Sequence, residues 1–291
     1  MPVANRRALA EHLSHNSSRY ADPLTTIEWD ALSIHDYWLP ADAISLSGLA
    51  EFESLPEFQR KRLSQYEFIS IIQAGVWLEQ IFLKRLIEAT RKENRTLAEH
   101  RYILHEIREE AGHSLMFLEL MHRAKLAIPS IENQWPGLAN FVGLHLPFNS
   151  ALFWLVVTIG EEVPDKMNRF IRKESSSSVN PVIQQMCTRH IKDEARHIAF
   201  AREQLDRAMA RTSRFSRYIS QALINRIFNE FVTAFYLPHE KIYEYAGLSN
   251  GRLWRQRARC NPKRVHLVEK CVLPTMRQLQ RYDIRLDLNS F

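Results

Sequence analysis

Apolar residues recur every three or four positions through most of the chain, which is the spacing of one face of a helix. We find no run in which apolar and polar residues alternate between turn residues, as a half-buried strand would require. Only eight glycines occur among the 291 residues. The pattern therefore predicts an all-α protein.

Five segments carry this spacing over the length of a long helix. We predict helices at residues 56–93, 95–125, 148–173, 181–210 and 214–245, the last broken near Pro238. The proline-containing segment 126–147 is expected to be the long crossover that lets a four-helix bundle change direction. We expect one domain over residues 1–291, with an N-terminal arm at 1–55, a metal-binding bundle at 56–247, a serine linker at 175–178 and a helical tail at 248–291.

Composition narrows the class of protein further. Hydrophobic residues make up 45% of the chain, enough for one large core. The net charge of +6 is spread over short basic clusters, which argues against a nucleic-acid partner. The excess of positive charge could still attract an acidic protein or an anionic substrate. The three cysteines form no C-x-x-C pair, and the longest apolar run, residues 152–159, is too short to cross a bilayer. We expect a soluble cytoplasmic protein without membrane contact.

The most informative stretch reads H-I-K-D-E-A-R-H, from His190 to His197. On a helix, His190, Glu194 and His197 fall within an arc of roughly 60°. An earlier stretch, E-I-R-E-E-A-G-H, from Glu106 to His113, matches it from the second position on as Ile, basic, acidic, Glu, Ala, any residue and His, so that Glu110 and His113 form a second E-x-x-H unit. Each E-x-x-H unit can offer one oxygen and one nitrogen to a metal ion, so two such helices facing each other could hold two ions.

A third copy of the spacing, Glu119 and His122, shows that E-x-x-H also arises by chance in a chain rich in these residues. Glu119 lies nine residues after Glu110, about 180° around the same helix. We interpret this copy as unrelated to the metal site.

Two single glutamates complete the candidate set. Glu79 lies on the apolar stripe of its helix, where an unpaired carboxylate is costly and a metal would compensate it. Its rivals Glu67 and Glu88 lie about 120° and 180° away around that helix. Glu162 precedes Glu194 by 32 residues, much as Glu79 precedes Glu110 by 31.

This near-symmetry selects Glu162, but its neighbour Glu161 stays an alternative, because Pro164 must bend the helix or open a bulge beside the acidic pair. Glu106 occupies the place that His190 takes in the second repeat. We leave Glu106 outside the set of metal ligands. Three roles stay open for it: an extra ligand, an acceptor for a ligand histidine, or a polar residue at the mouth of the site.

The predicted metal ligands are seven residues on four helices: Glu79, Glu110, His113, Glu162, His190, Glu194 and His197. Two single glutamates and two E-x-x-H units are the arrangement of di-iron or di-manganese carboxylate bundles. Mixed oxygen and imidazole donors suit iron or manganese, and a pair of ferrous ions can activate dioxygen.

Three stretches resemble the p-aminobenzoate N-oxygenase (AurF-type) family of non-haem di-iron oxygenases. They are A-G-V-W-L-E ending at Glu79, E-E-A-G-H-S around His113, and H-I-K-D-E-A-R-H from His190. The resemblance covers roughly residues 56–247. The histidine four residues before the second E-x-x-H glutamate is its most specific mark.

The resemblance implies a ferritin-like four-helix bundle whose seven ligands match the seven positions above. It further implies two iron ions, dioxygen as co-substrate and an external electron donor such as a reductase. The expected reaction is N-oxygenation of an arylamine, or of the amino group of a biosynthetic intermediate, in secondary metabolism. The amine could be a small molecule or be borne on an acidic carrier protein. The chain could also form a homodimer. The alternatives are a di-iron C–H hydroxylase or desaturase and a non-catalytic iron-binding ferritin-like protein.

Overall fold

A computed structural model describes residues 3–91, 95–130, 135–175 and 178–288. Its helices are α1 (Val3–Ser17), α2 (Pro23–Thr26), α3 (Ala50–Glu53), α4 (Glu57–Thr90), α5 (Leu97–Ala124), α6 (Gly137–His145), α7 (Ala151–Glu174), α8 (Pro181–Met209), α9 (Arg214–Tyr236), α10 (Glu240–Tyr245), α11 (Gly251–Cys260) and α12 (Pro262–Gln280). Two 3₁₀ turns lie at Trp29–Ala31 and Ala41–Ala43. Within the described ranges no strand forms, which confirms the all-α prediction.

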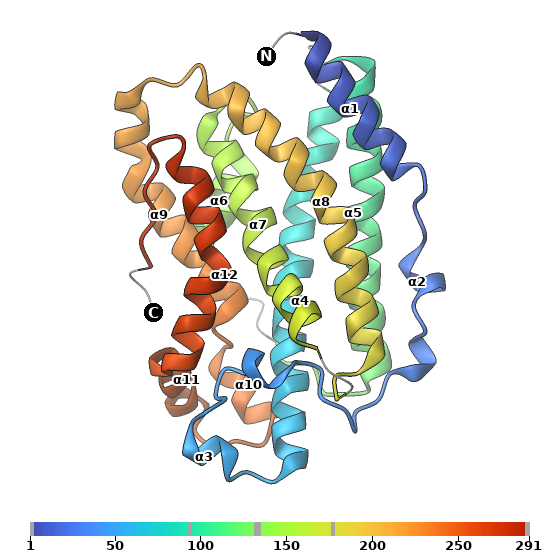
Figure 1. Cartoon of the computed structure of the whole chain (residues 1–291), viewed down its shortest axis with the longest axis vertical. Helices are drawn as coiled ribbons and strands as arrows, with labels where there is room; N and C mark the ends of the chain where they lie inside the picture. Colours follow the sequence, from blue (N-terminus) through green and yellow to red (C-terminus); the bar gives the residue numbers. More distant parts are fainter. Residues whose placement is uncertain (1–2, 92–94, 131–134, 176–177, 289–291) are drawn as a thin grey trace.

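Four long helices, α4, α5, α7 and α8, run along the long axis of the molecule (Figure 1). α4 packs against α5 and α7 against α8, and these are the two most extensive helix contacts. Each pair is joined by a short connection, so its two helices are antiparallel. The pairs meet where α5 packs on α8. This is the four-helix core that the repeat predicts.

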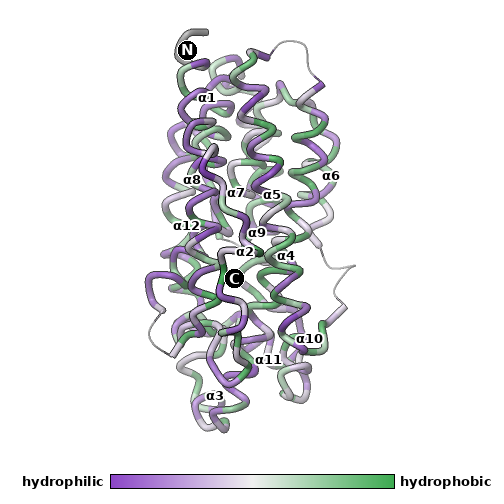
Figure 2. Tube along the Cα trace, turned by 90° about the vertical axis from the view of Figure 1, so that its right-hand side faces the viewer, coloured by the Kyte–Doolittle hydropathy of each residue, from purple (hydrophilic) through white to green (hydrophobic). Residues whose placement is uncertain are grey.

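The remaining helices cover the core. α1 packs on α5 and α8, and α9 and α12 pack on α7. Hydrophobic and hydrophilic residues alternate along every long helix in Figure 2, as amphipathic helices require. The buried apolar residues of all these elements form one core cluster. None of the helices in the described ranges combines the length and apolar character needed to span a bilayer.

The predicted helix boundaries agree with the structure to within a few residues, with three differences. The crossover contains α6, and the tail contains α11 as well as α12. α7 stays α-helical through Pro164, so no bulge opens beside the acidic pair. Residues 131–134 of the crossover, 176–177 of the serine linker, the predicted helix end at 93 and the termini 1–2 and 289–291 lie outside the described residues.

Local signals set the start of the two E-x-x-H helices. α5 begins with a capping box in which Thr96 accepts a hydrogen bond from the backbone of Glu99, and the Glu99 carboxylate accepts one from the Thr96 backbone. Glu99 also pairs with Arg207 of α8 at 2.9 Å. α8 begins with Asn180 as its cap and Pro181 in its first turn. These caps hold both ligand-bearing helices in register.

Glu67, which helix spacing excluded as a metal ligand, is buried on α4 twelve residues before Glu79. Its carboxylate accepts hydrogen bonds from the backbone and the hydroxyl of Ser45, at 2.9 and 2.5 Å. Burial raises its pKa to about 7, although nearby Arg264 and these hydrogen bonds favour the charged form. The group therefore keeps its proton in the folded state over a pH range in which the unfolded chain has lost it.

We predict that Glu67 makes stability pH-dependent. Between about pH 4.5 and 7 the folded state binds more protons at this position than the unfolded state, so stability falls as pH rises. Relative to the Glu67→Gln variant, the unfolding free energy of the wild type should drop by about 3 kcal/mol across this range. Urea unfolding of both proteins at pH 5 and pH 8 measures the difference. A pH-independent difference would contradict the prediction.

Candidate metal centre

Four helices point acidic and imidazole side chains at one buried position in the middle of the bundle. α4 supplies Glu79, α5 supplies Glu110 and His113, α8 supplies His190, Glu194 and His197, and α7 supplies Glu161. All seven residues are at most 6% exposed. Six of them are the predicted candidates, and the seventh is the neighbour of the residue that we preferred on α7.

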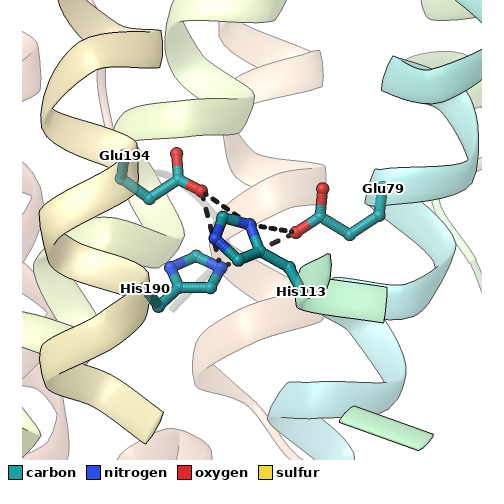
Figure 3. A group of neighbouring side chains, drawn as sticks. All are labelled: Glu79, His113, His190 and Glu194. Carbon is teal, nitrogen blue, oxygen red and sulfur yellow. Dashed lines mark ion pairs between the residues drawn. The ribbon is translucent and has the colours of Figure 1, made fainter. Parts of the chain in front are cut away.

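One group of donors consists of Glu79, His113, His190 and Glu194, whose ligand atoms lie within 4.8 Å of one another. His113 Nδ1 and His190 Nε2 are each 3.6 Å from Glu79 Oε1 and 3.5 Å from Glu194 Oε1. Figure 3 shows the two imidazoles between the glutamates, which approach from opposite helices. Two nitrogens and two oxygens surround one point.

A second group consists of Glu110, Glu161, Glu194 and His197, again within 4.8 Å. His197 Nδ1 is 3.2 Å from Glu110 Oε1 and 3.6 Å from Glu194 Oε1. Glu194 therefore belongs to both groups. Glu110 also reaches both, because its Oε2 lies 3.2 Å from His113 Nδ1 of the first group. Two shared carboxylates between two donor groups are the geometry of a dinuclear site.

Two divalent cations fit these residues. Glu79 Oε2, Glu194 Oε2, Glu110 Oε1 and His197 Nδ1 are buried without a hydrogen-bond partner in the described structure. Such orphaned atoms are costly in a low-dielectric interior. Four carboxylates and three neutral imidazoles carry a charge of −4, and two divalent ions carry +4. Oxygen and imidazole donors suit iron or manganese.

Each histidine turns its second ring nitrogen toward a polar partner outside the cluster. His113 Nε2 lies 3.3 Å from Asp193 Oδ2, and His197 Nε2 lies 3.0 Å from Glu109 Oε2. Arg196 pairs with both of these carboxylates, at 2.5 and 2.8 Å. Asp193 and Glu109 directly precede the E-x-x-H glutamates, so each E-x-x-H helix orients the histidine of the other.

His190 has a different partner. Its Nδ1 lies 3.1 Å from the side-chain amide of Asn168 on α7. The sequence pattern did not single out Asn168, Glu109, Asp193 or Arg196. The acidic residue before each E-x-x-H glutamate was the available signal, because it repeats at the same position in both motifs.

Burial and neighbouring charges shift the pKa values of several residues in the cluster. Burial by itself would lower the pKa of His113 and of His197, but the surrounding carboxylates raise both well above the ordinary value. His190 has fewer such contacts, and burial lowers its pKa to about 4. Burial together with Glu194 and Glu110 raises the pKa of Glu161. Such perturbation by burial and specific partners is typical of functional sites.

Glu162 is not in the cluster, which corrects our choice on α7. Its carboxylate accepts hydrogen bonds from Arg202 at 2.7 Å and from the Thr275 hydroxyl of α12 at 2.9 Å. Consecutive helical residues are about 100° apart, so Glu161 faces α5 and α8 when Glu162 faces α12. Because α7 remains a regular helix through Pro164, no bulge is needed to bring Glu161 inward.

The other glutamates that the sequence offered, Glu106, Glu119 and Glu88, lie outside the two donor groups, as predicted. Glu106 is buried one turn before Glu110, and desolvation raises its pKa to about 8. Glu119 pairs with Arg123 at 2.5 Å, on the outer side of α5. Glu88 pairs with Arg85 at 2.6 Å.

The N-terminal arm covers the centre from the side of α5 and α8. The ring of Tyr20 lies 4.5 Å from the Arg108 guanidinium and 4.9 Å from that of Arg189, which pairs with Asp193 at 2.9 Å. The Tyr20 hydroxyl occupies the space that a Cβ atom on Gly112 would need. Glycine between Glu110 and His113 therefore permits the arm to pack directly on the E-x-x-H helix.

Comparison with known proteins points to one family. The family model for P-aminobenzoate N-oxygenase AurF matches residues 3–283. Uncharacterized proteins of Mycobacterium bovis and Mycobacterium tuberculosis are each 24% identical over 253 residues, which is 84% of this chain and 74% of theirs.

Among solved structures, a mutant of R2-like ligand-binding oxidase with an anaerobically reconstituted Mn/Fe cofactor is similar. It has a TM-score of 0.57 at 13% identity and covers 96% of this chain and 94% of its own. A second mutant, with an aerobically reconstituted Mn/Fe cofactor, has a TM-score of 0.51 at 14% identity, over 91% and 92%. This similarity confirms the ferritin-like helical fold.

We predict that Glu161, and not Glu162, is required for full metal occupancy. Glu161→Gln removes one charged donor from the second group, so the protein should bind about one ion per chain less after anaerobic loading with ferrous iron. Glu162→Gln is the matched control, because it changes an adjacent buried carboxylate whose partners are Arg202 and Thr275. Elemental analysis of both variants, with helix content checked by circular dichroism, decides. Loss of metal in the control alone would reverse the assignment.

Proposed function

We propose that this chain, which belongs to the p-aminobenzoate N-oxygenase AurF family, oxygenates the nitrogen of an amine with dioxygen at a pair of iron ions. Family membership and the ferritin-like fold support the coarser statement that it is a di-metal oxidoreductase. The observation that carries the proposal is the seven-donor cluster with three imidazoles, His190 among them. The metal pair, the substrate and the electron donor are our inferences from it.

In this proposal Glu79, His113 and His190 would hold one iron ion, Glu161 and His197 would hold the other, and Glu110 and Glu194 would be available to both. When bound, the two iron ions would supply the Lewis acidity and pass on the electrons with which dioxygen is activated. Asp193 and Glu109 fix the ring orientation of His113 and His197. The side-chain amide of Asn168 contacts the His190 ring from outside the cluster, with its Nδ2 atom 3.1 Å from His190 Nδ1.

Apolar walls exclude bulk water from the centre. On one side a small cavity next to His190 is lined by Phe68, Ile72, Phe117 and Phe235. On the other side a small cavity next to Glu161 is lined by Phe82, Ile103, Phe153 and Phe200. Water exclusion strengthens electrostatic interactions and protects a reactive oxidant from side reactions.

The reaction balances as follows. An amine, R–NH₂, and dioxygen give R–NHOH and water when two electrons and two protons are supplied. The N–O bond forms at the nitrogen lone pair, and the second oxygen atom leaves as water. We propose a reductase as the source of the electrons. The substrate is a small amine or the same group carried by an acidic protein, which a basic surface would attract.

We predict that the purified protein binds two iron ions per chain. Removal of the ions by a chelator should lower the unfolding temperature, because the buried carboxylates then lose their counter-charges. Elemental analysis and thermal unfolding with and without ferrous iron test this. One zinc ion per chain would contradict the dinuclear assignment, and a many-subunit particle that mineralises iron, seen by size-exclusion chromatography, would favour storage.

We predict that the iron-loaded, reduced protein converts amines to N-hydroxylated products that carry one atom of ¹⁸O from labelled dioxygen. Mass spectrometry of a panel of aryl and alkyl amines, with matched hydrocarbons that lack the amine, measures it. Glu161→Gln is the inactive comparison and Glu162→Gln the active one. Oxygen found on carbon, with amines left unchanged, would replace this proposal by C–H hydroxylation.

A further inference from the structure

A polar cavity lies on the surface between the N-terminal helix α1 and the start of α5. α1 packs along the upper part of α5 in Figure 1. The volume of the cavity is about 760 Å³, which is within the range of small-molecule sites. It shares no lining residue with the two small cavities on either side of the metal centre. It is therefore a separate feature of the protein.

The start of α5 gives this cavity free backbone donors. The first N–H groups of a helix have no acceptor within the helix. The Thr96 hydroxyl accepts from the backbone of Glu99, but the N–H groups of Leu97 and Ala98 have no hydrogen-bond partner within the described ranges. Leu97 and Ala98 both line the cavity. Free N–H groups and the helix dipole together favour an anion at this position.

Ser14, on the α1 side of the cavity, has a hydroxyl without an acceptor. A serine hydroxyl inside a helix can donate to the carbonyl four residues earlier, as Ser220 does to Ser216 at 2.8 Å. Ser14 is 6% exposed, and its Oγ has no hydrogen-bond partner among the residues that the structure describes. A buried hydroxyl in this state is costly. An acceptor bound in the cavity that Ser14 lines would remove this cost.

The charged residues of the cavity favour an anion as well. Arg101 is exposed and has no ion-pair partner in the described part of the chain. Glu11, the one acidic residue of the lining, pairs with Arg7 at 2.8 Å. Two arginines and one glutamate leave a net charge of +1 while the histidines of the lining are neutral. An anion in this cavity therefore meets an uncommitted guanidinium.

We propose that this cavity binds a phosphate group, either as free phosphate or as the monoester of a small molecule. The phosphate oxygens accept from the N–H groups of Leu97 and Ala98, from the Ser14 hydroxyl and from the Arg101 guanidinium. These donors come from two helices. A phosphate group presents at least three acceptor oxygens and a carboxylate only two, so phosphate matches donors on two walls better. The site lies outside the metal centre and does not depend on the reaction proposed there.

A phosphate in this cavity would join two segments that are far apart in the sequence. Ser14 belongs to the N-terminal arm, whereas the other donors belong to the helix that bears Glu110 and His113. The same arm continues to Tyr20, which packs on Gly112 of that helix. A ligand that binds only when α1 lies on α5 stabilises this docked position of the arm. The site thus couples a phosphate ligand to the cover of the metal centre.

The first test is calorimetric titration of the iron-loaded protein, freed of excess metal, in a buffer without phosphate. The probes are inorganic phosphate, glycerol 3-phosphate and acetate. We expect at least one of the two phosphates to bind, and acetate to bind about tenfold more weakly or not at all. The relative affinity of the two phosphates identifies free phosphate or a monoester as the ligand. Failure of both phosphates to bind, or equally tight binding of acetate, would overturn the proposal.

The arginine variant tests the charge. Arg101→Gln should weaken phosphate binding about tenfold, the loss expected for one charge-assisted hydrogen bond. Arg259→Gln is the matched control, because Arg259 is exposed on α11, outside the cavity, and the net charge changes by the same amount. The affinity of this control should equal that of the wild type. Equal weakening in both variants would mean that net charge alone acts, and the site would be rejected.

A pair of serine variants on α1 tests the buried donor. Ser14 and Ser17 are both buried with unpartnered hydroxyls, but only Ser14 lines the cavity. Ser14→Ala should weaken phosphate binding about fivefold, and Ser17→Ala should leave it unchanged. Without phosphate, Ser14→Ala should not lower the unfolding temperature, because its hydroxyl has no partner to lose. A lower unfolding temperature, or unchanged affinity in Ser14→Ala, would contradict the assignment of this hydroxyl to the ligand.

The coupling to the arm is tested by hydrogen exchange of the full-length protein. With phosphate at ten times its dissociation constant, amides of α1 that exchange only when the arm detaches should exchange about tenfold more slowly. Arg101→Gln should need about ten times more phosphate for the same protection, and amides of α11 should be unaffected in both proteins. Phosphate binding without protection of α1, or with equal protection of α11, would show that the ligand does not join the arm to α5.

Discussion

Burial of four carboxylates at one point of the bundle is the constraint on which the rest of the structure depends. Glu79, Glu110, Glu161 and Glu194 meet in the centre, each nearly inaccessible to solvent. Carboxylates this close repel one another strongly in a low-dielectric interior unless positive charge lies among them. Three imidazoles supply hydrogen bonds, and two divalent cations would supply the missing charge. An aliphatic core at this position would be simpler to fold, so the arrangement is explained by function.

The surroundings divide the centre into two unequal halves. One half has two imidazoles, and His190 in it is supported by a neutral amide from Asn168. The other has one imidazole and borders the small cavity lined by Phe82, Ile103 and Phe200. Arg196 ties the two helices together through Asp193 and Glu109, so the histidines of both halves are oriented by one cation. Ions in such different donor sets are expected to differ in affinity and in the side from which they are reached.

Helix periodicity was sufficient to predict the fold, because α4, α5, α7 and α8 each repeat apolar residues every three or four positions along their length. The two E-x-x-H units could also be predicted from the sequence, because their spacing alone puts Glu and His on one helix face. The glutamate of α7 could not. α7 is buried on two sides, by α8 and by α12, so apolar residues surround it and the stripe no longer indicates which side faces the metal. Glu162 was chosen because its distance in sequence from Glu194 nearly equals that of Glu79 from Glu110. That distance contains no information on Thr275 of the tail, which contacts Glu162 only in the folded structure.

The contact between Tyr20 and Gly112 has a consequence for how the chain assembles. The arm is synthesised before α5 and α8, but the surface on which it packs is formed by α5 and by Arg189 of α8. It can settle only after both E-x-x-H helices have come together. The arm is thus synthesised before the surface on which it docks, and until it docks, the side of the centre that it covers is open to ions from solution.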